Sequence, residues 1–400
     1  MIANWCSHFH IILLLSLAIF VQISSQIETK VEVLPGFEGP LPFELQTGYI
    51  GLGERDDDMQ VFYYFIKSEN DPQNDPLMLW LSGGPGCSSV SAILFQFGPL
   101  AFDVDLEEYD ETGTLPNLIL RSPSWTKVCS IIFVDLPFGT GFSYAKNATT
   151  HRSDWKLVHH THQFLKKWLI HHPEFHSNEF YVGGDSYSGI PVPAIVQEIS
   201  NENEISLQPH INLQGYLLGN PITTHKERNH RIPFAHGMGL ISDELYACFS
   251  KLNLDHILKP CYEDDLPKKH EAQWRRSLSQ NQKLEVTLCK HYENSISNQW
   301  ANYESVRKSL HIREGTIGKW QRCYKTDFEY QIFNSFDFHA NLSAKGYRSL
   351  IYSGDHDGIA PLLSTQAWIR ALNYSIVEDW RPWLHRGQVA GDSMMEVHPQ

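Results

Sequence analysis

Five short apolar segments, each followed at once by Gly, Ser or Asp, constrain the fold of this 400-residue chain more than any other feature. They lie at residues 77–81, 131–134, 180–182, 216–218 and 350–352. Each segment is continuously apolar rather than alternating, which is typical of strands buried on both faces. Residues 154–171 carry apolar side chains three or four positions apart, as one face of a helix does. The alternation of strands and helices predicts an α/β fold with a mostly parallel sheet covered on both sides.

The strongest candidate for a catalytic site follows residues 180–182, because functional residues of such a sheet lie just past the carboxyl ends of its strands. The sequence GGDSYSG, followed by the helix-like IPVPAIVQEIS, places Ser186 at the apex of a tight turn between a strand and a helix. Small neighbours permit this turn, which exposes the hydroxyl as a nucleophile elbow does. Ser188 replaces the last glycine of the usual pattern and is still small. The alternative is a glycine-rich turn without catalytic function.

A second glycine-rich loop, SGGPGCSS, follows the strand predicted at residues 77–81. Consecutive glycines let backbone N–H groups face a ligand, so such a loop suits either an oxyanion or a phosphate. The Gly-Lys-Ser/Thr sequence that a phosphate-binding P-loop requires is absent from it.

A third candidate is SGDHDGIAP, which follows the last apolar segment. A hydrolase sheet places the carboxylate that orients its catalytic base after a late strand. The spacing Gly-x-x-Asp-x-x-x-Pro favours Asp357, with Asp355 as the alternative carboxylate. An acidic turn without catalytic function is the other interpretation.

Four motifs in this order resemble the serine carboxypeptidase family of α/β hydrolases. They are WLSGGPGCSS (80–89), IIFVDLPFGTGFSYA (131–145), GDSYSG (184–189) and SGDHDGIAP (353–361). The resemblance extends from about residue 34 to residue 383 and is greatest to plant serine carboxypeptidase-like proteins, which include acyltransferases that use sugar esters. It implies an α/β-hydrolase fold with a central, mostly parallel sheet and a helical cap insertion.

The resemblance implies a role for each motif. Ser186 matches the nucleophile and Asp357 the acid of a catalytic triad. The backbone N–H groups of Gly84 and Tyr187 match an oxyanion hole. The family's triad also needs a His in a Gly-Gly-Gly-His-Thr-Ala-Pro-like loop, and no Gly-Gly-Gly-His occurs in this sequence.

Substrate recognition is also implied by the resemblance. Family carboxypeptidases bind a peptide's terminal carboxylate with an Asn in the glycine loop and a Glu before the nucleophile. Here Ser82, next to Gly83, and Asp185 occupy these positions, which removes an amide donor and withdraws the carboxyl by about one methylene. Both changes resemble the acyltransferase branch. The implied reaction is transfer from a glucose ester of a small acid to an alcohol, through an acyl-Ser186 intermediate.

Two alternatives remain open: hydrolysis at a peptide's carboxyl terminus, or an inactive paralogue. Only His385 and His398 follow Asp357, and neither lies in a loop like the family's. We therefore expect impaired catalysis and a carboxyl-terminal part of the core that is incomplete. The expected partners are small-molecule acyl donors and acceptors or a peptide.

Metals, cofactors and nucleic acid are not expected partners. No CxxC or HExxH spacing is present, which argues against a zinc site. Residues 154–172 contain several His that we expect on a solvated helix face, namely His159, His160, His162, His171 and His172. The formal net charge is −14 and no run of Lys and Arg marks a basic face, which argues against nucleic acid.

Entry into the secretory pathway is predicted by three features. Residues 1–25 contain an apolar run of about eleven residues followed by small residues, as in a signal peptide. Glycan acceptor triplets begin at Asn147, Asn341 and Asn373. Six of the seven Cys lie outside the predicted signal peptide. A secreted or vacuolar protein without stable membrane insertion is therefore expected.

Disulfide pairings are implied by the family resemblance alone, because six Cys permit 15 complete pairings. It implies that Cys87 pairs with Cys323 and Cys248 with Cys261. Cys129 and Cys289 match no partner.

The predicted organisation is a hydrolase core interrupted by a cap. Residues 26–220 and 325–400 form the two parts of the core, and residues 221–324 the insertion. The insertion lacks strand-like runs and is rich in polar residues, which favours helices. The alternative is a divergent stretch of the same domain.

Overall fold

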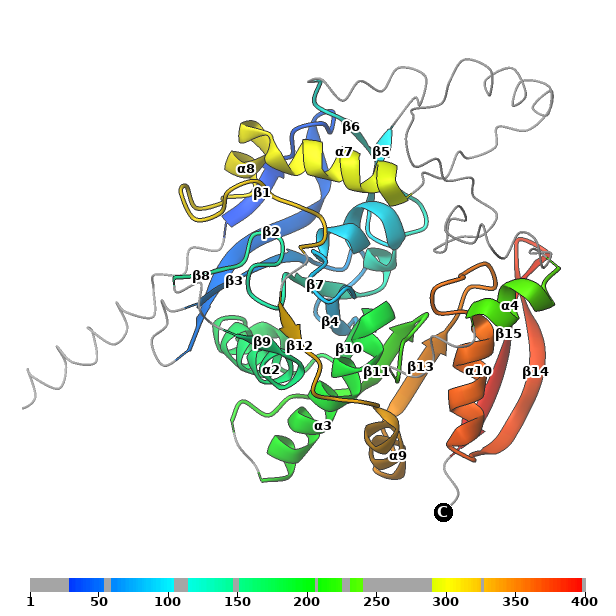
Figure 1. Cartoon of the computed structure of the whole chain (residues 1–400). Coiled ribbons are helices and arrows are strands. Elements are labelled where there is room, and N and C mark those ends of the chain that lie inside the picture. The colour runs from blue at the N-terminus through cyan, green and yellow to red at the C-terminus, as the bar shows by residue number, and fades with distance from the viewer. Residues whose placement is uncertain are drawn as a thin grey trace, which may run out of the picture.

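The computed structural model describes residues 29–53, 59–103, 114–146, 151–205, 208–224, 231–239, 290–324 and 327–397. Within these ranges the main sheet has the order β1-β2-β3-β7-β4-β10-β11-β13, with β8 pairing β3 (Figure 1). Its strands are β1 (Thr29–Val33), β2 (Pro40–Leu52), β3 (Met59–Ile66), β4 (Leu77–Leu81), β7 (Ser130–Val134), β8 (Tyr144–Ala145), β10 (Phe180–Asp185), β11 (Leu213–Gly219) and β13 (Arg348–Tyr352). From β7 to β13 neighbouring strands are parallel, whereas β1, β2, β3 and β7 pair antiparallel.

The predicted parallel sheet is confirmed. The five apolar segments of the sequence form β4, β7, β10, β11 and β13, which are consecutive neighbours in the sheet. In β4 the side chains of Leu77, Leu79 and Leu81 enter one hydrophobic core, and Met78 and Trp80 enter a second core on the opposite face. Strand side chains alternate between faces, so a strand between two cores is apolar throughout.

Helices cover both faces of the sheet (Figure 1). The helices are α2 (Asp154–His171), α3 (Pro191–Glu204), α4 (Arg231–Gly237), α7 (Lys290–Asn302), α8 (Glu304–Ser309), α9 (Phe336–Ala344) and α10 (Leu362–Ala371), with short turns η1 (Ala92–Gln96), η2 (Trp125–Lys127), η3 (Pro173–Phe175) and η4 (Ser186–Gly189). α2 and α3 bury Trp168 and Ile195 in the first core, and α7 buries Trp300 in the second. No helix within the described ranges is long and apolar enough to cross a membrane.

The helix predicted at residues 154–171 is α2. The solvated face expected for its His residues is wrong at two positions, because His162 and His172 are each only 2% exposed. His162 lies between α2 and α3, with Nδ1 2.9 Å from Glu198 Oε1. His172 stacks on Trp168, with ring centroids 3.7 Å apart.

The stretch predicted as a helical insertion, 221–324, contains α4, α7 and α8. Its described carboxyl-terminal part packs closely on the sheet, since Trp300, Val306 and Trp320 are buried in the second core together with side chains of β1, β2 and β3. Residues 225–230 and 240–289, including Cys248, Cys261 and Cys289, lie outside the described residues.

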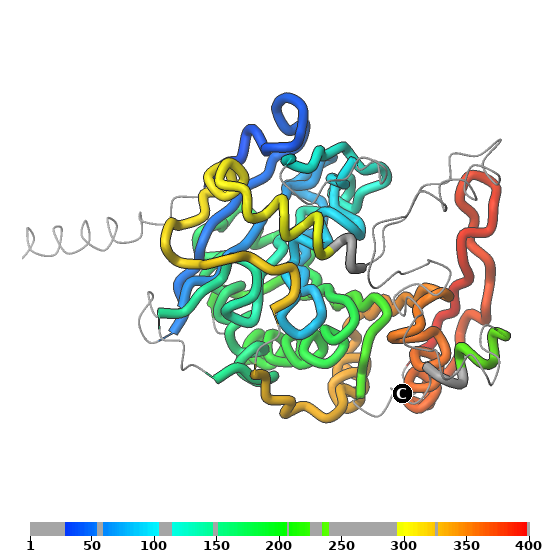
Figure 2. Tube along the Cα trace, turned by 45° about the horizontal axis from the view of Figure 1, so that its top comes forward, coloured from blue at the N-terminus to red at the C-terminus, as the bar shows by residue number. Residues whose placement is uncertain are grey.

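The last described segment is an antiparallel hairpin of β14 (Ser375–His385) and β15 (Gln388–Val397). Arg386 and Gly387, both at positive φ, form its two-residue turn. In the described structure these strands pair only with each other and lie to the side of the main sheet (Figure 2). All of β14 is exposed, and so is Leu350 on β13 (57%).

Two further small pairings join β5 (Leu100–Asp103) to β6 (Asn117–Leu120) and β9 (Arg152–Ser153) to β12 (Phe328–Glu329).

Candidate active site

Ser186 is the first residue of the 3₁₀ turn η4, which makes a sharp connection from β10 to α3. Its φ is +54°, a left-handed conformation that a residue with a side chain adopts only when its surroundings hold it there. Close packing explains the small neighbours, because a Cβ on Gly184 would lie 2.5 Å from Ser188 Cβ. Ser188 Oγ in turn donates to the Leu81 carbonyl at 3.0 Å. The backbone is that of the predicted nucleophile elbow.

The loop after β4 packs directly against this turn. A Cβ on Gly83 would lie 2.8 Å from Ser186 Cβ and 3.0 Å from the backbone nitrogen of Tyr187. Gly84 has φ +119°, which strains any other residue. Gly84 and Tyr187, the two expected oxyanion donors, therefore lie on adjoining segments because β4 and β10 are neighbours in the sheet.

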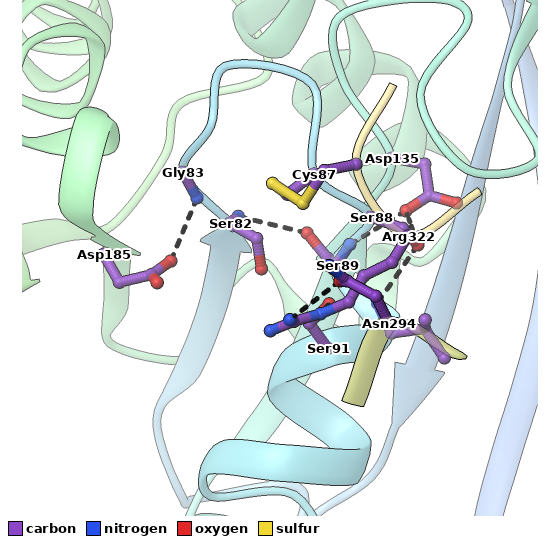
Figure 3. The surroundings of a disulfide bond; sticks show 12 residues. Ser82, Gly83, Cys87, Ser88, Ser89, Ser91, Asp135, Asp185, Asn294 and Arg322 are labelled. Carbon is purple, nitrogen blue, oxygen red and sulfur yellow. Dashed lines mark hydrogen bonds between the residues drawn. A yellow bond between two sulfur atoms is a disulfide. The ribbon is translucent and has the colours of Figure 1, made fainter. Parts of the chain in front are cut away.

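Asp185, expected to bind substrate, connects these two segments (Figure 3). Its Oδ1 accepts from the backbone N–H of Gly83 at 3.0 Å, and its Oδ2 accepts from Gln96 Nε2 at 3.1 Å. Burial raises the pKa of Asp185, and the bonds from Gly83 and Gln96 oppose that shift. The adjacent Ser82 hydroxyl is buried and has no hydrogen-bond partner among the described residues.

A second carboxylate, Asp135, holds the other end of the glycine loop (Figure 3). Its Oδ1 accepts from Ser88 Oγ at 2.7 Å and from the Ser89 N–H at 3.0 Å, and its Oδ2 accepts from the Phe142 N–H at 3.0 Å. Complete burial raises the pKa of Asp135 to about 6, although these three bonds favour the charged form. Neither Asp135 nor Gln96 was expected from the sequence to support the site.

Cys87 in the glycine loop forms a disulfide with Cys323, 236 residues later in the chain. Backbone hydrogen bonds on both sides reinforce this connection: Ser88 N–H donates to the Arg322 carbonyl at 2.8 Å, and Tyr324 N–H donates to the Gly86 carbonyl at 2.9 Å. Cys129 is half-buried and outside any disulfide in the described structure.

Asp357 lies in the loop after β13. Its Oδ1 accepts from the N–H groups of Ile359 at 2.6 Å and Ala360 at 3.1 Å. Asn220, at the end of β11, donates to the Ala360 carbonyl at 3.3 Å. Asp355, the alternative acid, has a side chain that is 77% exposed, with Oδ1 3.6 Å from His356 Nδ1.

The sheet order brings these motifs to one edge. β4, β10, β11 and β13 are parallel neighbours, so the loops after them lie side by side. Two strand spacings, about 10 Å, separate β10 from β13. The edge therefore carries the glycine loop, Ser186 and the Asp357 loop in this order.

No described His completes a triad with Ser186 and Asp357. His385 ends β14 in the exposed hairpin, and His398 lies outside the described residues. Among the residues that the structure describes, none makes a hydrogen bond with the Ser186 hydroxyl. No metal-binding group of His, Cys, Asp or Glu occurs in that part of the chain either.

The glycan acceptors Asn341 and Asn373 are exposed, and Asn147 lies outside the described residues.

Comparison with known proteins gives consistent matches. A profile of the family described as serine carboxypeptidase matches residues 35–253 and 245–396. Serine carboxypeptidase-like 7 of Arabidopsis thaliana is 49% identical over 398 residues, covering 95% of this chain and 89% of that protein. Serine carboxypeptidase-like 3 of the same plant is 51% identical over 380 residues, covering 91% and 84%. A prohormone-processing carboxypeptidase from Saccharomyces cerevisiae shares the fold, with TM-score 0.65, 21% identity and coverage of 92% and 87%.

Proposed function

Because this chain belongs to the serine carboxypeptidase family, we propose that its reaction is acyl transfer through an acyl-Ser186 intermediate. The donor is a glucose ester of a small acid and the acceptor an alcohol. The observation that carries this proposal is the strained elbow that holds Ser186 beside the Gly83–Gly84 loop. It supplies a nucleophile next to backbone donors for the developing charge.

Each step of the proposed reaction uses a group at the sheet edge. Ser186 Oγ attacks the ester carbonyl carbon of the donor and loses its proton to a base. The negative charge that forms on the carbonyl oxygen is held by the N–H groups of Gly84 and Tyr187. The bond to glucose then breaks, glucose takes the proton, and the acceptor alcohol attacks the acyl-Ser186 ester in the same way.

The bonding of Asp185 supports acyl transfer over peptide hydrolysis. Both of its oxygens already accept hydrogen bonds, from Gly83 and from Gln96. A carboxylate occupied in this way has less capacity to receive the terminal carboxyl group of a peptide. The name of the family, and the yeast prohormone-processing carboxypeptidase that shares the fold, favour carboxypeptidase as the second candidate.

We also propose that this chain performs the reaction slowly. His385 belongs to the exposed hairpin rather than to the sheet edge that carries Ser186. Without a base, Ser186 remains a protonated alcohol. Loss of one triad member lowers the rate on the order of 10⁴ to 10⁶, and the remaining catalysis comes from the oxyanion hole and binding.

Fluorophosphonate labelling tests the nucleophile and the base together. We expect slow labelling of the chain, none of Ser186→Ala, and faster labelling when imidazole is added as an external base. Rapid labelling without imidazole that His398→Ala or His385→Ala abolishes would show that a base is present. Absence of labelling even with imidazole would reject Ser186 as the nucleophile.

Substrate class is tested with acyl-glucoses plus alcohols, and separately with blocked dipeptides, all in the presence of imidazole. Mass spectrometry should detect acylated alcohol and little free amino acid. The double variant Ser82→Asn/Asp185→Glu should raise peptide hydrolysis relative to acyl transfer. Peptide cleavage by the unaltered chain, without turnover of acyl-glucose, would favour the carboxypeptidase instead.

Secretion and domain organisation are further parts of the proposal. A signal peptide at residues 1–25, glycans at Asn147, Asn341 and Asn373, and a Cys248–Cys261 disulfide fit a secreted or vacuolar protein. The cap would lie at residues 221–324, between core parts at 26–220 and 325–400. Mass analysis of the secreted protein, before and after glycan removal, tests the processing and the glycans.

A further inference from the structure

The carboxylate of Asp154 is a buried group that the proposed reaction does not use. It is the first residue of α2 and is 0% exposed. Its Oδ1 accepts from the Tyr187 hydroxyl, and its Oδ2 accepts from the backbone N–H groups of Gln331 at 2.6 Å and Ile332 at 2.9 Å. Three donors satisfy its two buried oxygen atoms. They come from two segments far apart in the sequence, the elbow and residues 327–332.

Tyr187 connects this carboxylate to the site. Its side chain is 5% exposed and packs against the rings of Phe328 and Tyr330, with centroids 5.9 and 5.7 Å away. Burial and the bond to Asp154 raise the pKa of Tyr187 well above its ordinary value, so the phenol stays a donor. Only the two side-chain torsions of Tyr187 separate that hydroxyl from the backbone N–H of the same residue, which is an expected oxyanion donor. Fixing the hydroxyl therefore restricts the peptide unit that follows Ser186.

The strained backbone at Ser186 needs such restraints, and a second one acts on the same peptide unit. The carbonyl of Ser186 accepts from the Ile222 N–H at 2.8 Å, which holds its peptide unit from the β11 side. The bond between Tyr187 and Asp154 holds the next side chain through α2. A left-handed residue with a side chain persists only when its surroundings fix it in this way.

We propose that Asp154 is a positioning residue: through the Tyr187 hydroxyl it holds the backbone N–H of Tyr187 where the oxyanion forms. Its second oxygen fastens residues 327–332 beside the elbow, where β12 pairs with β9 next to Asp154. This inference rests on the proposed function, since an oxyanion forms only if Ser186 attacks a carbonyl.

The test compares Tyr187→Phe, Asp154→Ala and the double variant with the unaltered chain. The first readout is hydrogen exchange of peptides covering residues 180–190. The second is the rate of fluorophosphonate labelling with added imidazole, per folded molecule. Tyr216→Phe is the matched control, because it also removes a buried hydroxyl, one whose oxygen lies 2.6 Å from His339 Nδ1.

We expect both single variants to exchange faster at 180–190 and to be labelled about tenfold more slowly, part of the effect of deleting an oxyanion donor. The double variant should be no slower than Asp154→Ala, because both changes break the same bond. Tyr216→Phe should match the unaltered chain in both readouts.

Exchange at 180–190 decides the inference even if the proposed function fails. Unchanged exchange in Tyr187→Phe, or effects of the single variants that multiply in the double variant, would overturn it. If the unaltered chain is never labelled, the proposed function is rejected, while faster exchange in both variants still supports the link between Asp154 and the elbow. Should Asp154→Ala not fold, Tyr187→Phe decides alone, since it removes a single oxygen atom.

Discussion

The carboxylate of Asp185 accepts a hydrogen bond from the backbone N–H of Gly83, which precedes it by 102 residues, at 3.0 Å. The residue before the nucleophile is thereby joined to the loop that carries an expected oxyanion donor. Gln96 occupies the other carboxylate oxygen. The position of the loop thus depends on a side chain to which the family resemblance assigns a role in substrate binding.

Removing this connection should destabilise the protein. In Asp185→Ala, the Gly83 N–H and the Gln96 amide lose their acceptor, which should lower the free energy of unfolding by about 1–3 kcal/mol. Adding Gln96→Ala should lower it little further, because its partner is already absent. Urea unfolding measures the free energy of unfolding of each variant. If the losses of the two substitutions add up in the double variant, Asp185 and Gln96 do not share a bond.

Gly83 should tolerate no side chain. A Cβ there would lie 2.8 Å from both the Asp185 carbonyl and Ser186 Cβ. Gly83→Ala should therefore lower the free energy of unfolding by about 1–3 kcal/mol and slow labelling of Ser186. Gly318→Ala is the control, since nothing lies within 4 Å of its added methyl group. Equal stability of the two variants would contradict the close packing of loop and elbow.

Asp135 should make stability depend on pH. Its pKa in the folded protein is raised to about 6 by burial, above the ordinary value of about 3.9 in an unfolded chain. Between about pH 4 and about pH 6 the folded state binds more protons than the unfolded state. The protonation of Asp135 therefore stabilises the folded protein fully below about pH 4, and this stabilisation is lost as the pH rises through about 6. The total change is on the order of 3 kcal/mol.

Urea unfolding midpoints between pH 4 and pH 7 measure this effect. In Asp135→Asn the decline with pH should be smaller than in the unaltered chain, because the variant does not titrate at this position. The Asn amide must also face a donor, so its absolute stability should be lower at low pH. An identical pH profile in both proteins would be incompatible with the raised pKa.

The disulfide should contribute strongly to the stability of the folded protein because it closes a long loop. Cys87 and Cys323 are 236 residues apart, and breaking a native disulfide typically lowers stability by 2–5 kcal/mol. Cys87→Ser should therefore reduce the melting temperature markedly. Cys129→Ser, at a half-buried cysteine outside any described disulfide, should have a smaller effect. Similar melting temperatures for both variants would argue against the bond.

Features that depend on local pattern could be predicted from the sequence. The apolar segments identified the parallel strands, and the small residues around Ser186 identified the turn. The burial of His162 had a signal too, because it lies in register with the apolar side chains of Val158 and Leu165 on α2. Its polarity led to the wrong expectation of a solvated position.

The supporting contacts had no such local signal. Gln96 and Asp185 are 89 residues apart, and Asp154 meets the Gln331 N–H across 177 residues. Such pairs form only once the sheet order is fixed, so neither composition nor periodicity can identify them. The exposed hairpin of β14 and β15 was not predicted either, because its apolar side chains favour burial.

The pairing of β4 with β10 has a consequence for how such a gene can vary. Trp80 lies opposite Gly183 and Leu81 opposite Gly184, so both strands end together at the active-site edge. Losing a single codon within β4 would exchange the side chains of the two cores and retract the glycine loop by about 3.3 Å. Length changes should therefore accumulate in the outer loops, while the short stretches that lead into the two active-site turns keep a fixed number of residues.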